Sequence, residues 1–487
     1  MKPIQKIVQK TQHPVRVLQF GEGNFLRGFA DLLIDCANEA SGFDAGVVIV
    51  KPRGGALSPA FAEQDHIYTV CLRGNADGAA VERYHTITCI RDAVDPRGQY
   101  ELYMQYAFEK ELRFVISNTT EAGIVYDETD SFELSPPNSF PGKVTKLLYE
   151  RCVYFNYAPD KGLIFLPCEL IDDNGTMLKA CVRRLAERWD LGDRSLAWLD
   201  EACIFANTLV DRMVTGYPND EADAICEKCG YTDRLLVCGE PFGLWVIESD
   251  REIARELPLP DTYVKFTDHL KPYKQRKVRI LNGAHTSFCL ASYLCGYDYV
   301  VDAVNDLDIR AYLKETLHRE IIPTLTMPQP ELLTFAQDVL ERFENPYIRH
   351  SLLAISLNSV SKWRARCLPT VLDSIRNTGL IPSHLAFSLA ALLAFYHGKK
   401  DLDGRLLGKR GDDVYEIKDD LSVLAFFDAH YGDEAEILVS ECLSRKDFWG
   451  MDLTSIDGFA QEVCKYLTSI YRDGMRTALQ TVCGGGN

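Results

Sequence analysis

The chain has 487 residues, of which 46% are hydrophobic and 25% are charged, and its formal net charge is −17 at pH 7. This length is too great for one ordinary hydrophobic core, so we expect two domains. The acidic excess argues against nucleic acid and anionic membrane surfaces as general partners, because both repel a negatively charged protein. A small anionic substrate remains compatible with it if Lys and Arg gather locally in a cleft.

The sequence predicts a cytoplasmic protein without a metal. Residues 1–6 lead into polar sequence rather than the apolar core of a signal peptide, and no run approaches the ~18 apolar residues of a membrane span. Reduced thiols are therefore expected for the 16 cysteines. Cys226, Cys229 and Cys238 lie close in sequence, but a structural zinc site usually takes two pairs of ligands and no second pair exists.

The first motif lies near the start of the chain. Residues 15–20 are typical of a short buried strand, the turn Gly21-Glu-Gly-Asn-Phe-Leu-Arg-Gly28 follows at once, and residues 29–37 have helical periodicity. Strand, glycine turn and helix open a dinucleotide-binding unit, in which Gly21 permits the tight turn and Gly23 lets the backbone approach a pyrophosphate. The third position of the usual G-x-G-x-x-G motif is Leu26, so an ordinary glycine turn is the alternative.

Further apolar runs predict strands at residues 46–50, 86–90, 113–117 and 162–166, separated by helical stretches at 141–154 and 176–189. This alternation predicts a Rossmann-like, doubly wound and mostly parallel sheet, with ligands at the carboxyl ends of its strands. The second strand ends in Lys51-Pro-Arg53, where an NAD enzyme often carries an acid, so these residues alone leave NADP open.

The second half of the chain has a different pattern. Leu257-Pro-Leu-Pro260 is the clearest linker, so we expect a nucleotide-binding domain over residues 1–260 and an all-helical domain over 261–487. Helical periodicity predicts helices at residues 277–294, 308–322, 332–343, 347–376, 384–396 and 456–479.

Three polar residues of different chemistry share the first of these helices. Lys277, Asn282 and His285 lie at offsets 0, +5 and +8, which an ideal helix places within roughly 140°. Hydride addition to a ketone leaves negative charge on oxygen, which an asparagine can stabilise in a dry cleft. A lysine whose pKa is lowered by burial and nearby cations can supply the proton, and a histidine can orient hydroxyl groups. A solvated helix face is the alternative interpretation.

The two motifs together resemble the mannitol dehydrogenase family of long-chain, metal-independent polyol and hexuronate dehydrogenases. Further matching stretches lie at residues 117–123, 167–171, 208–212, 271–274, 280–286 and 342–348. The resemblance implies a Rossmann domain followed by a helical domain, an active site between them and NAD as the cofactor. It implies Lys277 as general acid/base, Asn282 in the oxyanion hole and His285 on the substrate. The expected cofactor-binding residues are Phe20, Gly21, Gly23, Asn24, Phe25, Arg27, Asn118, Thr119 and Glu121.

The substrate side of the resemblance has one departure. Polyol members of the family carry a second oxyanion asparagine where this chain has Glu169-Leu170, so Asn174 or a backbone amide is left for that role. The expected substrate-binding residues are Lys362, Asp211 and Arg364. Arg366, Arg349 and His350 are further candidates for a substrate carboxylate, which the forked donors of arginine suit best.

The activity that the resemblance implies is reversible, NADH-dependent reduction of D-tagaturonate to D-altronate. Two sister activities are the alternatives, namely reduction of D-fructuronate or a mannitol-type reaction on a neutral ketose. A nucleotide-sensing protein that lost the chemistry is a third alternative, which the intact Lys277, Asn282 and His285 disfavour. The sequence predicts a small-molecule hexuronate partner and leaves the oligomeric state open.

Overall fold

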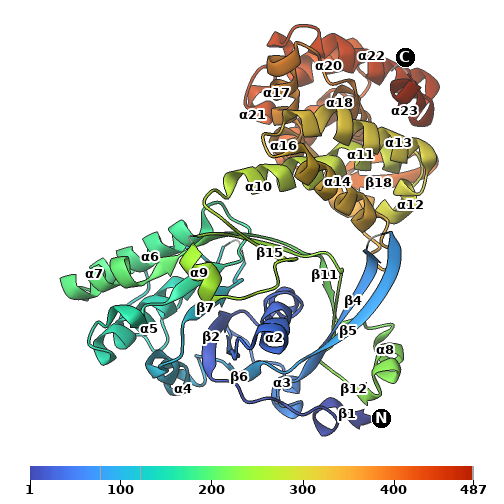
Figure 1. Ribbon diagram of the computed structural model, residues 1–487. Helices are drawn as coiled ribbons and strands as arrows, with labels where there is room; N and C mark the ends of the chain where they lie inside the picture. Colours follow the sequence, from blue (N-terminus) through green and yellow to red (C-terminus); the bar gives the residue numbers. More distant parts are fainter. Residues whose placement is uncertain (77, 121, 250, 485–487) are drawn as a thin grey trace. The chain divides into compact units, whose positions relative to one another are not determined.

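The computed structural model describes residues 1–76, 78–120, 122–249 and 251–484, without the side chains of residues 251 and 252 (Figure 1). The chain divides into two compact units, Met1–Leu270 and Lys271–Asn487. The sequence predicted a boundary after residue 260, and the division in the structure follows Leu270.

Unit 1 is built on a parallel sheet that contains six strands among the described residues. Their order across the sheet is β6 (Ile90–Val94), β3 (Gly46–Val50), β2 (Val15–Phe20), β7 (Phe114–Ser117), β8 (Ile164–Pro167) and β9 (Ile204–Phe205). Counted along the chain this is the order 3-2-1-4-5-6 of a Rossmann fold. The predicted fold class is therefore confirmed for this unit.

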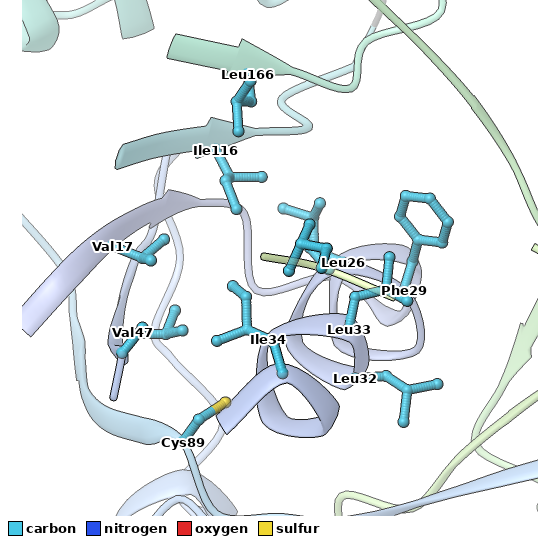
Figure 2. Close-up of a cluster of buried hydrophobic side chains, with 14 of the residues drawn as sticks. Val17, Leu26, Phe29, Leu32, Leu33, Ile34, Val47, Cys89, Ile116 and Leu166 are labelled. Atoms are coloured by element: carbon cyan, nitrogen blue, oxygen red, sulfur yellow. The ribbon is translucent and has the colours of Figure 1, made fainter. Parts of the chain in front are cut away.

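Apolar side chains cover both faces of this sheet, which explains why its strands are continuous apolar runs. On one face, Val17 of β2 and Ile116 of β7 pack against helix α2 (Ala30–Ser41), and Figure 2 shows both of them with Ile34 of that helix. On the other face, Leu18 and Val115 pack against α5 (Phe140–Tyr154), α6 (Asn174–Arg188) and α7 (Asp193–Ala202). The sheet is therefore doubly wound.

Among the described residues, unit 1 has three further sheets that were not predicted. The smallest pairs β1 (Lys2–Pro3) with β12 (Tyr231–Thr232), and the other two are larger. One has the order β11 (Val214–Gly216), β13 (Val237–Gly239), β4 (Tyr68–Ala76) and β5 (Ala79–Ile87), and the other β10 (Asn207–Asp211), β14 (Leu244–Glu248) and β15 (Val264–Thr267). The strand predicted at residues 86–90 is wrong, because β5 ends at Ile87 and β6 begins at Ile90. Two different sheets share that apolar run.

The helix predicted at residues 29–37 also differs. A four-residue helix, α1 (Asn24–Arg27), precedes it, and α2 begins at Ala30 after Phe29 leaves helical geometry at φ −131° and ψ −78°. The remaining helices of unit 1 are α3 (Ala60–Glu63), α4 (Tyr100–Gln105), α8 (Ala222–Cys229) and α9 (Arg251–Glu256).

Unit 2 is mostly helical, as predicted, with an additional small sheet of strands β16 (Gly398–Lys400), β17 (Leu406–Arg410) and β18 (Asp413–Ile417). Its α- and π-helices among the described residues are α10 (Lys271–Arg276), η4 (Lys277–Asn282), α11 (Gly283–Leu294), α12 (Val300–Val304), α13 (Leu307–Glu315), η5 (Thr316–Ile321), α14 (Gln329–Phe343), α15 (Leu352–Ile355), α16 (Ser359–Arg366), α17 (Leu368–Thr378), α18 (Ser383–Phe395), α19 (Leu421–Ala429), α20 (Ala435–Leu443), α21 (Lys446–Trp449), α22 (Phe459–Asp473) and α23 (Met475–Gly484). Within the described part of the chain, no helix is long and apolar enough to cross a membrane.

The single helix predicted at residues 347–376 is wrong. It is three helices, α15 to α17, and residues 347–351 precede them in non-helical backbone. Asn358 has a left-handed backbone at φ +54°, which ends the helical path before α16. Pro369 at the second position of α17 lacks the N–H that would continue the helix from α16. These breaks set the direction of α16, on which Lys362 and Arg366 lie.

Candidate active site

The glycine turn of unit 1 follows β2 at the point where the strand order of the sheet reverses. Gly21 has φ +139°, and an added Cβ would lie 3.1 Å from the Asn118 carbonyl oxygen and 3.0 Å from Leu26 Cδ1. The Asn118 N–H in turn donates to the Phe20 carbonyl at 3.0 Å, so β2 and β7 hold the turn between them. Only glycine can adopt this backbone conformation at position 21 without strain.

The other two glycines of the turn have different surroundings. Gly23 is exposed, and an added Cβ would meet no atom within 4 Å, so its backbone is open to a ligand. Gly28 packs closely on another strand, since an added Cβ would lie 3.0 Å from Val214 Cγ1. The close-packing role that the usual motif gives to its third glycine is therefore filled by Gly28, and Leu26 is buried core.

Most side chains of the turn contact other residues of the chain. Phe20 is buried, with its ring tilted against that of Phe140 at a centroid distance of 4.8 Å, and Phe25 stacks on Phe29 at 5.1 Å. Arg27 donates to the Leu235 carbonyl at 2.6 Å. The Arg27 guanidinium also donates to Asn24 Oδ1 at 2.6 Å. The two polar side chains that were predicted to bind the cofactor therefore bind each other. Any contact of this turn with a cofactor therefore falls chiefly to its backbone.

The predicted residues after β7 are similarly engaged. Buried Glu169 accepts hydrogen bonds from the Thr119 N–H at 2.9 Å, the Thr119 hydroxyl at 2.8 Å and the Ser117 hydroxyl at 3.0 Å. Burial nevertheless raises the pKa of Glu169 above its ordinary value. Asn118 Nδ2 donates to the Cys168 carbonyl at 3.0 Å. These contacts tie the ends of β7 and β8 together, and Glu121 lies outside the described residues.

Both cations after β3 have partners. The Lys51 ammonium forms an ion pair with Glu22 of the glycine turn. The Arg53 guanidinium donates to the Thr119 carbonyl and the Thr120 hydroxyl. Lys51 therefore has its charge compensated by Glu22, whereas the partners of Arg53 are uncharged oxygens.

In unit 2, Lys277–Asn282 forms the π-helix η4 between α10 and α11. In a π-helix each N–H bonds the carbonyl five residues earlier, so the turn is wider than in an α-helix. Lys277 and Asn282, five residues apart, come closer around the axis than the ~140° of an α-helix. Such insertions occur frequently at functional sites. Arg279 lies in the same segment but pairs with Asp373 at 2.6 Å, so its charge is compensated.

His285 lies one turn further, on α11, in an aromatic and basic setting. Its ring centroid is 4.1 Å from that of Phe343 and 5.4 Å from that of His350. Burial holds the pKa of His285 well below its ordinary value. The nearby groups that lower it further are His350, Arg342, Arg366 and Lys362. The imidazole is therefore neutral at pH 7 and offers one N–H donor and one acceptor nitrogen.

Two cations of α16 join this cluster. Lys362 Nζ donates to the Ile355 carbonyl at 2.9 Å, and Arg366 Nη1 donates to the Thr286 hydroxyl at 3.2 Å. Burial first, and Arg366 second, lower the pKa of Lys362. Lys277, Asn282, His285 and Lys362 thus lie on helices η4, α11 and α16 of one unit. Arg366 was only a secondary candidate, although its spacing of four residues from Lys362 predicts the same helix face.

Other sequence-predicted residues lie elsewhere. Arg364 is exposed on α16 and donates to the Asp447 carbonyl at 3.4 Å, so the structure does not bring it to the cluster. Asp211 is buried at the end of β10 in unit 1. Asn174 cannot serve as an oxyanion donor, because Nδ2 donates to the Pro167 and Thr208 carbonyls, each at 3.0 Å.

The chain matches known proteins over nearly its whole length. The family profile described as the mannitol dehydrogenase Rossmann domain matches residues 15–260, and that of the mannitol dehydrogenase C-terminal domain matches residues 269–471. It is 42% identical over 482 residues to an altronate oxidoreductase of Escherichia coli O7:K1, covering 97% of this chain and 98% of that protein. It is 43% identical over 481 residues to one of Pectobacterium atrosepticum, with coverages of 97% and 98%.

Solved structures share the fold at lower identity. A substrate-free D-sorbitol dehydrogenase has a TM-score of 0.80 and 22% identity, covering 98% of this chain and 100% of that chain. Pseudomonas fluorescens mannitol 2-dehydrogenase, solved as a ternary complex with NAD and D-mannitol, has a TM-score of 0.68 and 21% identity, with coverages of 99% and 96%.

Proposed function

The chain belongs to the mannitol dehydrogenase family, and from that premise we propose that it reversibly reduces D-tagaturonate to D-altronate with NADH. The observation that carries this proposal is the near-full-length similarity to altronate oxidoreductases of two bacterial genera. A polyol activity would leave the basic cluster around His285 without a charged substrate group to bind.

Unit 1 is proposed to hold the dinucleotide. The backbone at Gly21 and Gly23 suits a pyrophosphate, because Gly21 keeps the turn tight and Gly23 presents no side chain. NAD is proposed as the cofactor from membership of the family. Of the two cations after β3, Lys51 pairs with Glu22, whereas Arg53 contacts only uncharged oxygens. When bound, NADH supplies the hydride that the ketone carbon receives.

Unit 2 is proposed to bind the ketose and handle its proton. As hydride reaches the carbonyl carbon, the oxygen takes up negative charge, which the Asn282 amide stabilises by hydrogen bonding. Lys277 then donates a proton to that oxygen and takes it back in the oxidation direction. Neutral His285 orients a substrate hydroxyl, because its two ring nitrogens can donate to it and accept from it.

A panel of substrates tests this function. Purified enzyme with NADH is given D-tagaturonate, D-fructuronate and D-fructose, and kcat/KM is measured for each from the loss of NADH absorbance. We expect D-tagaturonate to give the highest value. A higher value for D-fructuronate would assign the chain to the sister uronate activity, and a preference for D-fructose would refute the uronate assignment altogether.

A further inference from the structure

Lys362 and Arg366 form a pair of cations that no acidic side chain neutralises. In the described part of the chain, neither of them lies within 4.0 Å of a carboxylate oxygen. Other arginines of unit 2 do, for example Arg410 with Asp298 at 2.8 Å and Arg476 with Asp306 at 2.9 Å. Both members of the pair are half-buried, so solvent screens their charges only in part.

Among the described residues, the one carboxylate whose charge acts on Lys362 from a distance already has hydrogen-bond partners. Asp419 Oδ2 accepts the Tyr396 hydroxyl at 2.5 Å and the Val360 N–H at 3.2 Å. Lys362 and Arg366 are one helical turn apart and share a face of α16, so each raises the cost of keeping the other charged. Two neighbouring cations without an acidic partner are unexpected in a chain of net charge −17, and a bound anion would explain them.

Hydrogen bonds link Arg366 of this pair to the segment that carries the proposed reacting groups. Arg366 Nη1 donates to the Thr286 hydroxyl, and that hydroxyl donates to the Asn282 carbonyl at 2.9 Å. The end of α16 also meets the start of α11, since an added Cβ on Gly283 would lie 3.4 Å from the Arg366 carbonyl oxygen. Arg366 is therefore linked through the Thr286 side chain to the backbone of Asn282, and its charge acts on His285.

A neutral hydrogen-bonding group completes the cluster. His350 packs on His285 at a ring distance of 5.4 Å, and its Nδ1 is buried without a hydrogen-bond partner among the described residues. Such an atom is costly unless a ligand binds it. The cluster thus offers a forked cation, an ammonium and a free imidazole nitrogen, which together suit a carboxylate with a neighbouring hydroxyl.

We propose that Arg366, supported by Lys362, binds the carboxylate of the substrate and makes the enzyme select a uronate over the neutral ketose of the same shape. This inference rests on the proposed function, since the carboxylate is that of D-tagaturonate. Arg366 supplies the fork that fits both carboxylate oxygens, and its bond to Thr286 fixes the distance from that carboxylate to Asn282. Selectivity then follows from one charge at the end of the substrate remote from the ketone.

The test compares D-tagaturonate with D-tagatose, in which a hydroxymethyl group replaces the carboxylate. Arg366→Met removes the charge and keeps an apolar stem, and we expect it to lower kcat/KM for D-tagaturonate by about 100-fold or more, mainly through KM. D-tagatose should change by less than about fivefold, so the ratio between the two substrates collapses. Arg366→Lys restores the charge without the fork and should recover part of the loss. Arg364→Met, on the exposed side of the same helix, is the matched control and should stay within about twofold of wild type.

The outcomes separate the two proposals. If Arg366→Met keeps the wild-type preference for D-tagaturonate, or loses both substrates equally while its thermal unfolding matches wild type, the carboxylate assignment is overturned and the function stands. If wild type prefers D-fructuronate and Arg366→Met loses that preference over D-fructose, the function is wrong and the carboxylate assignment stands. If Arg366→Met does not fold, the same comparison made with Arg366→Lys decides: a ratio unchanged from wild type in that variant overturns the role of the fork.

Discussion

Arg27 and Arg366 are two guanidinium groups, each beside one of the predicted motifs, with opposite surroundings. Arg27 donates to the Leu235 carbonyl, to the Glu22 carbonyl and to Asn24 Oδ1, and it lies 5.3 Å from the Tyr68 ring centre. Within the described residues, the Arg366 guanidinium makes a single hydrogen bond, to Thr286. The polar side chains of the glycine turn thus hold its own backbone, whereas Lys362 and Arg366 of α16 each make one side-chain hydrogen bond within the described part of the chain.

This difference predicts different consequences for substitutions. Around the glycine turn, side-chain changes act on the free energy of unfolding or, through the backbone, on cofactor affinity. Around His285 they act on turnover and substrate selectivity, with smaller effects on folding.

The largest effect is expected at Lys277. Replacing it with Met removes the proposed proton donor, and since general acid/base groups contribute about 10²- to 10⁴-fold, kcat should fall by that factor. NADH affinity, measured by fluorescence titration, should not change. Lys271→Met, at the exposed start of the neighbouring α10, is the control. Turnover of Lys277→Met within about threefold of wild type would remove lysine from the mechanism.

The next effect is a pH dependence of stability at Asp31, beneath the glycine turn. Asp31 is fully buried, accepts the Tyr68 hydroxyl at 2.7 Å, and burial raises its pKa from 3.8 to about 7. The folded state therefore favours the protonated form. Its stabilising contribution is complete below about pH 4 and is lost as the pH rises through 7.

The Asp31→Asn variant has no carboxyl at this position, so it does not lose this stability as the pH rises. The free energy of unfolding of the variant relative to wild type should rise between pH 4 and pH 8 by on the order of 4 kcal/mol, measured by urea denaturation at each pH. Asp35→Asn is the contrast, because Asp35 accepts backbone N–H groups of Thr88 and Cys89 at 2.9 and 2.8 Å and should lose stability throughout that range. A pH-independent difference for Asp31→Asn would show that its carboxyl does not titrate in this window.

The smallest effect is expected at Gly21. An Ala there would meet the Asn118 carbonyl and adopt a strained φ, which costs about 1–3 kcal/mol and shifts the turn. We expect NADH to bind roughly tenfold more weakly. Gly42→Ala has φ +66° with no atom near its added Cβ, so it should lower stability slightly and leave NADH affinity unchanged. Equal NADH affinity in both variants would separate the Gly21 turn from cofactor binding.

The parts of the fold that could be predicted are those with a strong local pattern. The strands β2, β3, β7 and β8 are apolar runs because the sheet is covered on both faces, and helical periodicity identified most of unit 2. The strands β16 to β18 were missed because they have only three to five residues, several of them charged or glycine. The π-helix was missed because one added residue per turn barely changes an apolar pattern.

At the site, the sequence identified residue types but not their partners. It could not show that Arg279 pairs with Asp373, or that Lys51 pairs with Glu22, because tertiary folding brings these residues together. It could have favoured Arg366 over Arg364, since four residues from Lys362 is one helical turn and two residues is roughly the opposite face.

The most direct test of the central claim follows the hydride itself. The enzyme is incubated with D-tagaturonate and NADH that carries deuterium at the transferable position of the nicotinamide ring, and the product is examined by mass spectrometry and NMR. We expect D-altronate with one deuterium on the carbon that was the ketone. Consumption of NADH without deuterium at that carbon, or no reaction with D-tagaturonate, would contradict it.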